Sequence, residues 1–477
     1  MLFASTLKRP RAGRVRRIAA VSALAALMAV GCGEDSAEPD PTPGPGPGGN
    51  PADTAGAVYI TNPVVAPATP DPGPAAGVTP VAHHGRLRTE GAYIVNQHGR
   101  AAQLRGMSLY WSIQTTGRQF YNAQAVDFLA KDWKASVVRA AMGVEDSFGG
   151  DQQGYIANPA ANRDRVVTVV DAAIASGIYA IIDWHSHKAE NNQSQAVSFF
   201  QEMSAKYKDY PNVIYEIYNE PTTSGSMTDD LYWQAIKPYM QAVTNAIRAN
   251  DPSNLIIIGN PRWCLLPDLA AASPVTGANI AYTAHFYAGE ATNSEATLNH
   301  TARLRERIYR TMQMGFPVFV TEFGTVAADG AGAVNTAQTD IWMDFMDQFH
   351  IGWANWSLSS LSESSAALMP GAPTTGNWNS NLSASGSYIR TRHQTPRKAV
   401  PAFYTAKVRQ IGQGEVAVSP RPATQQLFTA GQTVSLIAEP APGWRFAGWA
   451  GTHPSTETML THMLTGNLDV VARFEPQ

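Results

Sequence analysis

Hydrophobic and polar positions divide the chain into four stretches with different patterns. An apolar run follows a basic N-terminal head, and a stretch dominated by Pro, Gly and Ala continues from Glu34 to about Val81 without a hydrophobic period. Residues 85–410 alternate short β-rich runs with longer segments of helical period, whereas residues 414–477 hold only short strand-like runs between Pro and Gly turns. The pattern predicts a targeting segment, a disordered linker over 32–84 and two folded units.

Eight apolar runs have the composition of buried strands, and they cover residues 103–110, 135–143, 179–186, 213–220, 255–261, 280–287, 317–325 and 351–359. Segments of helical period lie between them; in 229–250, residues Leu231, Ile236, Tyr239 and Val243 fall roughly on one face. This alternation predicts a (β/α)8 TIM barrel, while 414–477 predicts a small all-β module. A doubly wound sheet is the alternative for the barrel, but no glycine-rich phosphate loop follows the first strand.

The carboxyl ends of barrel strands are where chemistry is expected. Six of the predicted strands deliver polar or aromatic side chains there: Arg139, Asp183, His185, His187, Asn219, Glu220, His285, Tyr287, Glu322 and Trp356. Any one of them could be a satisfied core residue or a salt bridge, but packing alone does not account for ten on one rim. Two glutamates and a tryptophan around one cavity suit glycoside cleavage, which needs one carboxyl group as acid and a second facing the anomeric carbon.

Seven ordered motifs then make a family resemblance specific: "LRGMSLYW", "VVRAAMG", "IIDWHSH", "IYEIYNEP", "YTAHFY", "VTEFGT" and "ANWSLSSLSESSAAL". Over roughly residues 85–410 the chain resembles glycoside hydrolase family 5, and most of all its bacterial endo-β-1,4-glucanase (cellulase) branch. The resemblance implies a (β/α)8 fold and retaining hydrolysis of internal β-1,4-glucosidic bonds. It also implies that no metal or organic cofactor is needed.

The resemblance also assigns roles to residues. Glu220 corresponds to the acid/base and Glu322 to the nucleophile. Supporting or substrate-binding positions correspond to Arg139, His185, Asn219, His285, Tyr287, Trp356, Glu363 and Trp111. Two positions depart from the family: "GMSLYWS" places Tyr110 where many relatives have a His-containing stretch, and Leu361 stands where many have Lys. Both concern the nonreducing-side sugars, so they affect subsite detail and not the reaction.

The C-terminal stretch resembles divergent bacterial repeat modules related to the internalin B-repeat, through "TAGQTVSLIAEPAPGWRFAGWAG" and "VVARFEP". Such modules are compact β structures of extracellular proteins. Trp444 and Trp449 could stack on a glycan, but we expect both to pack in the module's core.

The N-terminal residues 1–31 are expected to be an export signal, because six basic residues precede an apolar run too short to span a bilayer comfortably. The run ends in "AVGC", which resembles a bacterial lipoprotein cleavage site, although Ala29 stands where Leu is usual. We expect lipidation and membrane anchoring at Cys32, with simple secretion as the alternative, by the Sec or the twin-arginine route. The protein is therefore expected at the cell surface, as an outer-membrane lipoprotein, or outside the cell.

Composition narrows the remaining possibilities. A net charge of −3 gives no reason to expect nucleic acid as a partner, and the two cysteines, Cys32 and Cys264, do not form a disulfide framework. We expect a monomer acting on β-glucan. Two other classes stay open: a metal hydrolase using His185 and His187, and a non-enzymatic glycan-binding protein. Within the enzyme class, mannan, xyloglucan or mixed-linkage glucan could replace cellulose as the substrate.

Overall fold

The structure is a computed structural model that describes residues 57–59, 65, 68–146, 151–222, 227–290, 300–398, 401–419 and 427–477. The predicted export signal and Cys32 lie outside these residues, as does most of the predicted linker. The last part of that linker has a defined structure, because helix α2 covers Pro80–His84. Thr79 caps this helix through its side chain and Pro80 occupies its first turn, a pairing that favours helix initiation even in a Pro-rich stretch.

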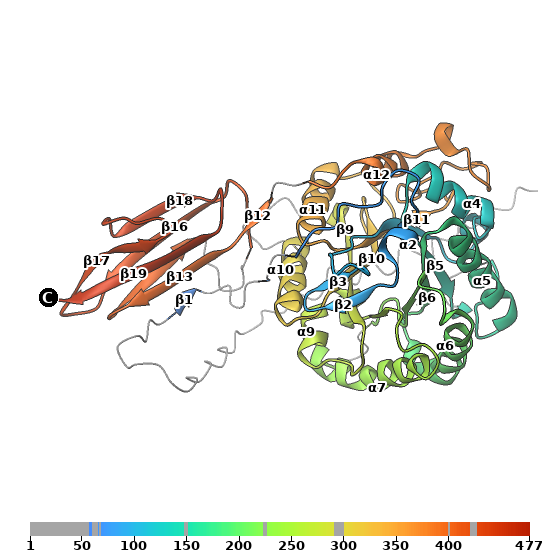
Figure 1. Ribbon diagram of the computed structural model, residues 1–477, viewed down its shortest axis with the longest axis horizontal. Coiled ribbons are helices and arrows are strands. Elements are labelled where there is room, and N and C mark those ends of the chain that lie inside the picture. Colours follow the sequence, from blue (N-terminus) through green and yellow to red (C-terminus); the bar gives the residue numbers. More distant parts are fainter. Residues whose placement is uncertain are drawn as a thin grey trace, which may run out of the picture. The chain divides into compact units, whose positions relative to one another are not determined.

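All eight predicted strands form, and together they close a parallel barrel in the order β10-β11-β4-β5-β6-β7-β8-β9 (Figure 1). The strands are β4 (Arg105–Leu109), β5 (Val137–Gly143), β6 (Tyr179–His185), β7 (Val213–Glu216), β8 (Ile256–Ile258), β9 (Ile280–Tyr287), β10 (Val318–Gly324) and β11 (Trp353–Leu358). The predicted (β/α)8 fold class, with an all-β module after it, is confirmed. Strand β7 is shorter than predicted, so Asn219 and Glu220 follow the strand instead of ending it.

Helices surround the barrel in the connections between strands (Figure 1). They are α3 (Thr115–Arg118), α4 (Ala123–Phe128) with a π-helical continuation to Trp133, α5 (Pro159–Ser176), α6 (Gln193–Tyr207), α7 (Asp229–Arg248), α8 (Pro261–Cys264), α9 (Pro267–Ala272), α10 (His300–Gln313), α11 (Thr336–Gln348) and α12 (Ala384–Gln394). In α7 the predicted face is wrong at one position. Ile236, Tyr239 and Val243 are buried, but Leu231 is 62% exposed, because it is the third residue of the helix, in the first turn after the Thr228 cap.

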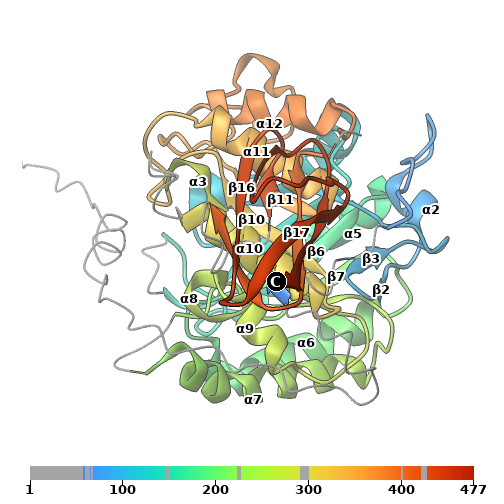
Figure 2. The same ribbon diagram turned by 90° about the vertical axis from the view of Figure 1, so that its left-hand side faces the viewer.

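The amino end of the barrel is closed by apolar side chains from the beginnings of the strands, such as Val137, Tyr179 and Ile214, packed with Leu87 and Ile94. Ile94 belongs to a hairpin of β2 (Arg88–Glu90) and β3 (Tyr93–Val95), and Leu87 directly precedes it. Helix α2 and this hairpin lie side by side in both views (Figure 1 and Figure 2). The end of the barrel away from the strand carboxyl termini is thus sealed.

The C-terminal residues form a separate all-β unit with its own core. One sheet has the order β1-β13-β19-β17 and another the order β14-β16-β18. The strands are β1 (Ala57–Tyr59), β13 (Ala406–Ile411), β14 (Gly414–Ser419), β16 (Thr433–Pro440), β17 (Trp444–Gly451), β18 (Met459–Met463) and β19 (Leu468–Pro476); a two-stranded sheet joins β12 (Phe403–Tyr404) to β15 (Phe428–Thr429). Trp449 is buried in the core and its indole donates to the Glu457 carbonyl, whereas Trp444 packs against the core from a half-buried position.

Candidate active site

A fully buried arginine organises the carboxyl end of the barrel. Arg139, in β5, lies 2.9 Å from Asp183 and 2.6 Å from Glu216. Its Nη1 donates to Glu322 Oε2 at 2.9 Å and its Nη2 to Asn219 Oδ1 at 2.6 Å. The carboxylates around it raise the pKa of Arg139 further, even though burial alone would lower it. The guanidinium therefore stays charged and fixes four acceptors that come from three strands, β6, β7 with the residues after it, and β10.

Glu322, in β10, is oriented by two hydrogen-bond donors. The hydroxyl of Tyr287, at the end of β9, donates a hydrogen bond to Glu322 Oε1 at 2.6 Å, and Arg139 donates to the other carboxylate oxygen. Burial raises the pKa of Tyr287 well above its ordinary value, so that its hydroxyl keeps the proton it donates. A carboxylate fixed in this way can present a lone pair in one direction, as a nucleophile must.

Glu220 follows β7 in the sequence "YNEP" and accepts hydrogen bonds from two histidines. His285 Nδ1 lies 2.9 Å from its Oε1, and His187 Nε2 lies 3.0 Å from its Oε2. Burial alone would raise the pKa of Glu220, but these hydrogen bonds outweigh it and lower the pKa. Burial alone would lower the pKa of His285, but the neighbouring carboxylates of Glu216, Glu220 and Glu322 more than reverse this and raise it to about 9. The His285–Glu220 pair therefore carries a proton at neutral pH.

The two glutamates are close enough for retaining chemistry. A carboxylate oxygen of Glu220, one of Glu322 and a ring nitrogen of His285 all lie within 4.8 Å of one another. Retaining glycosidases hold their two carboxyl groups about 5–5.5 Å apart, and inverting ones about 6.5–9.5 Å. The spacing belongs to the first class.

Aromatic rings line the same end of the barrel. Trp356, in β11, stacks on the His185 ring with centroids 5.4 Å apart and planes 11° from parallel. Tyr110 lies 5.1 Å from Trp356 and stacks on Trp111 at 5.4 Å. Leu361, the second departure from the family pattern, packs against this cluster. Flat apolar faces of this kind accommodate the faces of sugar rings.

Every predicted site residue in the barrel thus lies at its carboxyl end or in the loop after β11. Glu363 lies in the loop after β11; its carboxylate accepts a hydrogen bond from the hydroxyl of Ser365, and burial raises its pKa. Asn219 is buried and its carbonyl oxygen faces Arg139. His185 Nδ1 lies 2.7 Å from a carboxylate oxygen of Asp183, within hydrogen-bond distance. Burial and the neighbouring Arg139 lower the pKa of His185 to about 3, so this ring is neutral.

Sequence reasoning missed Glu216 as part of this network. It stands within the apolar run "VIYEIYNE" and binds Arg139 through both oxygens, while Thr321 Oγ1 donates to it at 2.7 Å. A carboxylate inside a fully buried strand was the available signal, because such a group needs a buried cation. His187 was listed at a strand end and as a possible metal ligand but was given no role in the glycosidase site, yet it contacts Glu220.

The paired histidines do not support a metal hydrolase. His185 contacts Asp183 and His187 contacts Glu220, so the two rings serve different carboxylates. Within the described residues, neither belongs to a group of three side chains that could share a metal ion. The group Glu220, His285 and Glu322 is compact enough, but the guanidinium of Arg139 already neutralises Glu322.

Comparison with known proteins decides the family. The Cellulase (glycosyl hydrolase family 5) profile matches residues 95–362, more than half of the chain. The chain belongs to glycosyl hydrolase family 5. It is a glycoside hydrolase, and its C-terminal residues 404–477 match the Divergent InlB B-repeat domain.

Several similar proteins carry the name endoglucanase, and one is named cellulase. Endoglucanase Z of Dickeya dadantii is 42% identical over 373 residues, which cover 77% of this chain and 80% of that protein. Endoglucanase of Clostridium saccharobutylicum is 39% identical over 331 residues, covering 67% of this chain and 68% of the relative. Among solved structures, the catalytic domain of Thermobifida fusca endoglucanase Cel5A has 35% identity and a TM-score of 0.59, covering 66% of this chain and all of that domain, 100%. Among the described residues, no helix is long and apolar enough to cross a bilayer.

Proposed function

We propose that this family 5 hydrolase is an endo-β-1,4-glucanase that cleaves internal bonds with retention of configuration. The observation that carries the proposal is the pairing of Glu220 and Glu322, with oxygens within 4.8 Å of each other and opposite hydrogen-bond environments. Glu322 accepts hydrogen bonds from Arg139 and Tyr287, whereas Glu220 is joined to His285, whose pKa is raised. The two carboxyl groups can therefore act as nucleophile and as acid/base.

In the first step, a Glu322 oxygen attacks the anomeric carbon and forms a glycosyl ester while the bond to the leaving oxygen breaks. Glu220 gives that oxygen a proton. Because Glu220 lies 2.9 Å from His285 Nδ1, the proton held by the pair can reside on either partner as the reaction demands. Arg139 and Tyr287 stabilise Glu322 as it departs in the second step.

In the second step, Glu220 removes a proton from water, and the water oxygen attacks the same carbon and releases Glu322. Two inversions at one carbon restore the β configuration. Asn219, fixed by Arg139 at 2.6 Å, is placed to bond the sugar's 2-hydroxyl group. Trp356, Trp111 and Glu363 extend the binding surface for further sugars, and no cofactor takes part.

Endoglucanase is the name carried by the relatives with 39–42% identity, which favours β-1,4-glucan as the substrate. The test is a reducing-sugar and viscosity assay on carboxymethylcellulose, mannan, xyloglucan and mixed-linkage glucan. An endo-acting glucanase should reduce carboxymethylcellulose viscosity before many reducing ends appear. A higher kcat/KM on mannan or xyloglucan than on carboxymethylcellulose would show that cellulose is not the main substrate. Lack of viscosity loss would contradict internal cleavage.

We also propose export and lipid anchoring at Cys32, supported by the basic head, the apolar run and "AVGC". Mass spectrometry of the mature protein should find a lipid on Cys32 as the first residue. A mature protein that begins at another residue and carries no lipid would contradict lipid anchoring and support simple secretion. We also propose two units, a barrel from about residue 85 and a C-terminal module, with the boundary before β12 instead of at residue 410, because β13 pairs with β19. All proposed catalytic residues lie in the barrel unit, so we propose that the protein acts as a monomer.

A further inference from the structure

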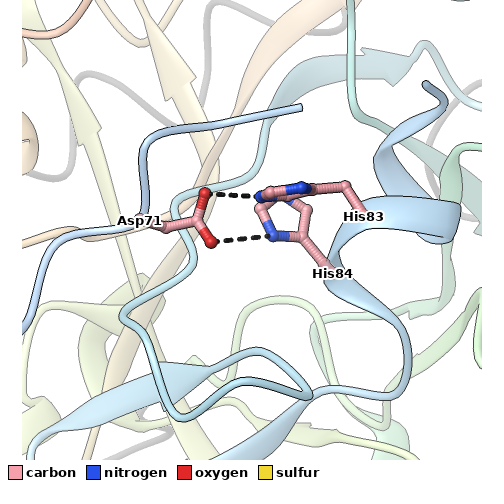
Figure 3. A group of neighbouring side chains, drawn as sticks. All are labelled: Asp71, His83 and His84. Carbon is pink, nitrogen blue, oxygen red and sulfur yellow. Dashed lines mark hydrogen bonds and ion pairs between the residues drawn. The ribbon is translucent and has the colours of Figure 1, made fainter. Parts of the chain in front are cut away.

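A second group of potential metal ligands lies at the opposite end of the barrel. Asp71, His83 and His84 each offer a ligand atom, and these atoms lie within 4.8 Å of one another. His83 and His84 end helix α2, and Asp71 lies in the preceding segment; all three side chains point into one space (Figure 3). Gly85 accepts a bond from the hydroxyl of Tyr179, the first residue of β6, so the group belongs to the amino end of the barrel.

The convergence of the two histidines is unusual for a helix, where consecutive side chains point in different directions. Their rings meet edge to face, with centroids 4.7 Å apart. His83 Nε2 lies 2.8 Å from Asp71 Oδ1, and His84 Nδ1 lies 3.8 Å from Asp71 Oδ2. In a tetrahedral Zn²⁺ site with bonds of about 2.0–2.1 Å, neighbouring ligand atoms are about 3.3 Å apart. The two separations bracket that value.

His84 provides the observation that points to a ligand. It is 4% exposed, and among the described residues no hydrogen-bond partner reaches its buried Nδ1. A buried ring nitrogen without a partner loses the hydrogen bond that water would give. This nitrogen faces the Asp71 carboxylate across a gap too long for a hydrogen bond and suited to an ion between them.

The carboxylate itself is oriented by donors outside the group. The backbone N–H of Gly73 donates to Asp71 Oδ1 at 2.6 Å, and the side-chain amide of Asn96 donates to Oδ2. The amide of Asn96 is itself fixed, because its oxygen accepts from the backbone N–H groups of His98 and Arg100. Metal-binding carboxylates are held by outer partners of this kind.

We propose that Asp71, His83 and His84 bind one divalent transition metal ion of the Zn²⁺ type. Two imidazole nitrogens and one carboxylate oxygen form a donor set that suits Zn²⁺, with water or His98 completing the shell. His98 is exposed and its ring centroid lies 6.4 Å from that of His83. Arg397 donates to the Asp71 backbone carbonyl, and its positive charge limits the affinity for a cation.

The site's role is structural. A metal ion there would join the segment containing Asp71 to helix α2, next to the hairpin that closes the barrel. Residues at the amino end of a barrel serve stability, since the chemistry occurs at the other end. Ion binding to the folded state alone raises its stability in proportion to the logarithm of free ion concentration.

Zinc titration tests the proposal. Untagged full-length protein, stripped with EDTA, is titrated with ZnCl₂ by calorimetry at pH 7.5 and heated with and without the ion. We expect one equivalent to bind to the wild type and to raise Tm. His84→Phe keeps an aromatic ring next to Tyr179 but removes both nitrogens, and Asp71→Asn keeps an acceptor for Gly73. Each should weaken Zn²⁺ binding more than about tenfold and abolish the gain in Tm.

Two controls exclude other zinc sites. His453 and His462, with ring centroids 4.7 Å apart, form another histidine pair, and His453→Asn with His462→Asn should leave the titration unchanged. Glu220→Gln removes a member of the catalytic group and should also leave it unchanged. Circular dichroism verifies folding, and should His84→Phe fail to fold, Asp71→Asn and His83→Gln provide the comparison. A wild type without stoichiometric zinc, or unchanged binding in the ligand variants, would overturn the proposal.

Discussion

The two ends of the barrel hold clusters with the same kinds of side chain and different charge environments. At the carboxyl end, Glu322 contacts a buried guanidinium and Glu220 has a histidine on each oxygen. At the amino end, Asp71 has one close histidine, and the Nδ1 of His84 stands 3.8 Å away. Where positive protein groups already satisfy the carboxylates, the cluster is suited to proton transfer and nucleophilic attack. Where a buried ring nitrogen has no hydrogen-bond partner among the described residues, as in His84, a cation can complete the set.

The largest effect expected is loss of the nucleophile. Glu322→Ala should lower kcat/KM on carboxymethylcellulose and on aryl cellobiosides alike by about 10⁴-fold or more, because no other group can form the glycosyl ester. EDTA should not change wild-type turnover at temperatures well below Tm, although it should lower Tm through the other cluster. Near-normal activity of Glu322→Ala would contradict its role as the nucleophile. Turnover that depends on a metal ion would contradict metal-free catalysis at the carboxyl end of the barrel.

Next in size is the cost of breaking the buried network. Glu216→Leu leaves Arg139 without its bidentate partner and should lower the free energy of unfolding by about 3–5 kcal/mol, as measured by urea denaturation. The matched control is Glu475→Gln, whose partner Arg445 is also 2.6 Å away but exposed, and which should cost at most about 1 kcal/mol. Equal losses of unfolding free energy in the two variants would show that the burial of Arg139 does not increase the cost of removing its carboxylate partner.

A smaller effect concerns pH. The folded pKa of His285 is raised from 6.5 to about 9, so its contribution to stability is complete below pH 6.5 and is lost as pH rises through about 9. Wild-type protein should therefore lose unfolding free energy between these values. His285→Gln should lack that part of the decline. Parallel pH profiles for the two proteins would contradict the charged His285–Glu220 pair.

The smallest effect is expected from removing the C-terminal module. Strand β13 pairs with β19, so a truncation that spares the barrel must end before β12, for example at Lys398. Its kcat on soluble carboxymethylcellulose should stay within about twofold of the full chain, because all proposed catalytic residues remain. A large fall in kcat would show that the module supports the catalytic unit. Weaker binding to insoluble glucan alone would give it a targeting role.

The two ends also differ in how far the sequence could predict them. Apolar runs with polar ends predicted all eight strands and the carboxyl-end residues, because parallel strands bring their carboxyl ends together whatever their separation in sequence. Glu216 was missed because its partner Arg139 is 77 residues away. Asp71 was hidden in a Pro- and Gly-rich stretch whose composition predicts disorder. Its contacts depend on helix α2, which turns two consecutive histidines toward it.

The most direct test of the two-glutamate mechanism is the product that Glu220→Ala forms from an aryl β-cellobioside in sodium azide. This variant should lose about 10²–10⁴-fold on polymer, yet still form the ester with Glu322 when the leaving group needs no proton. Azide needs no general base, so it should accelerate turnover and, by NMR, give the β-cellobiosyl azide. An α-azide, or no acceleration by azide, would contradict the assignment of Glu220 as acid/base and Glu322 as nucleophile.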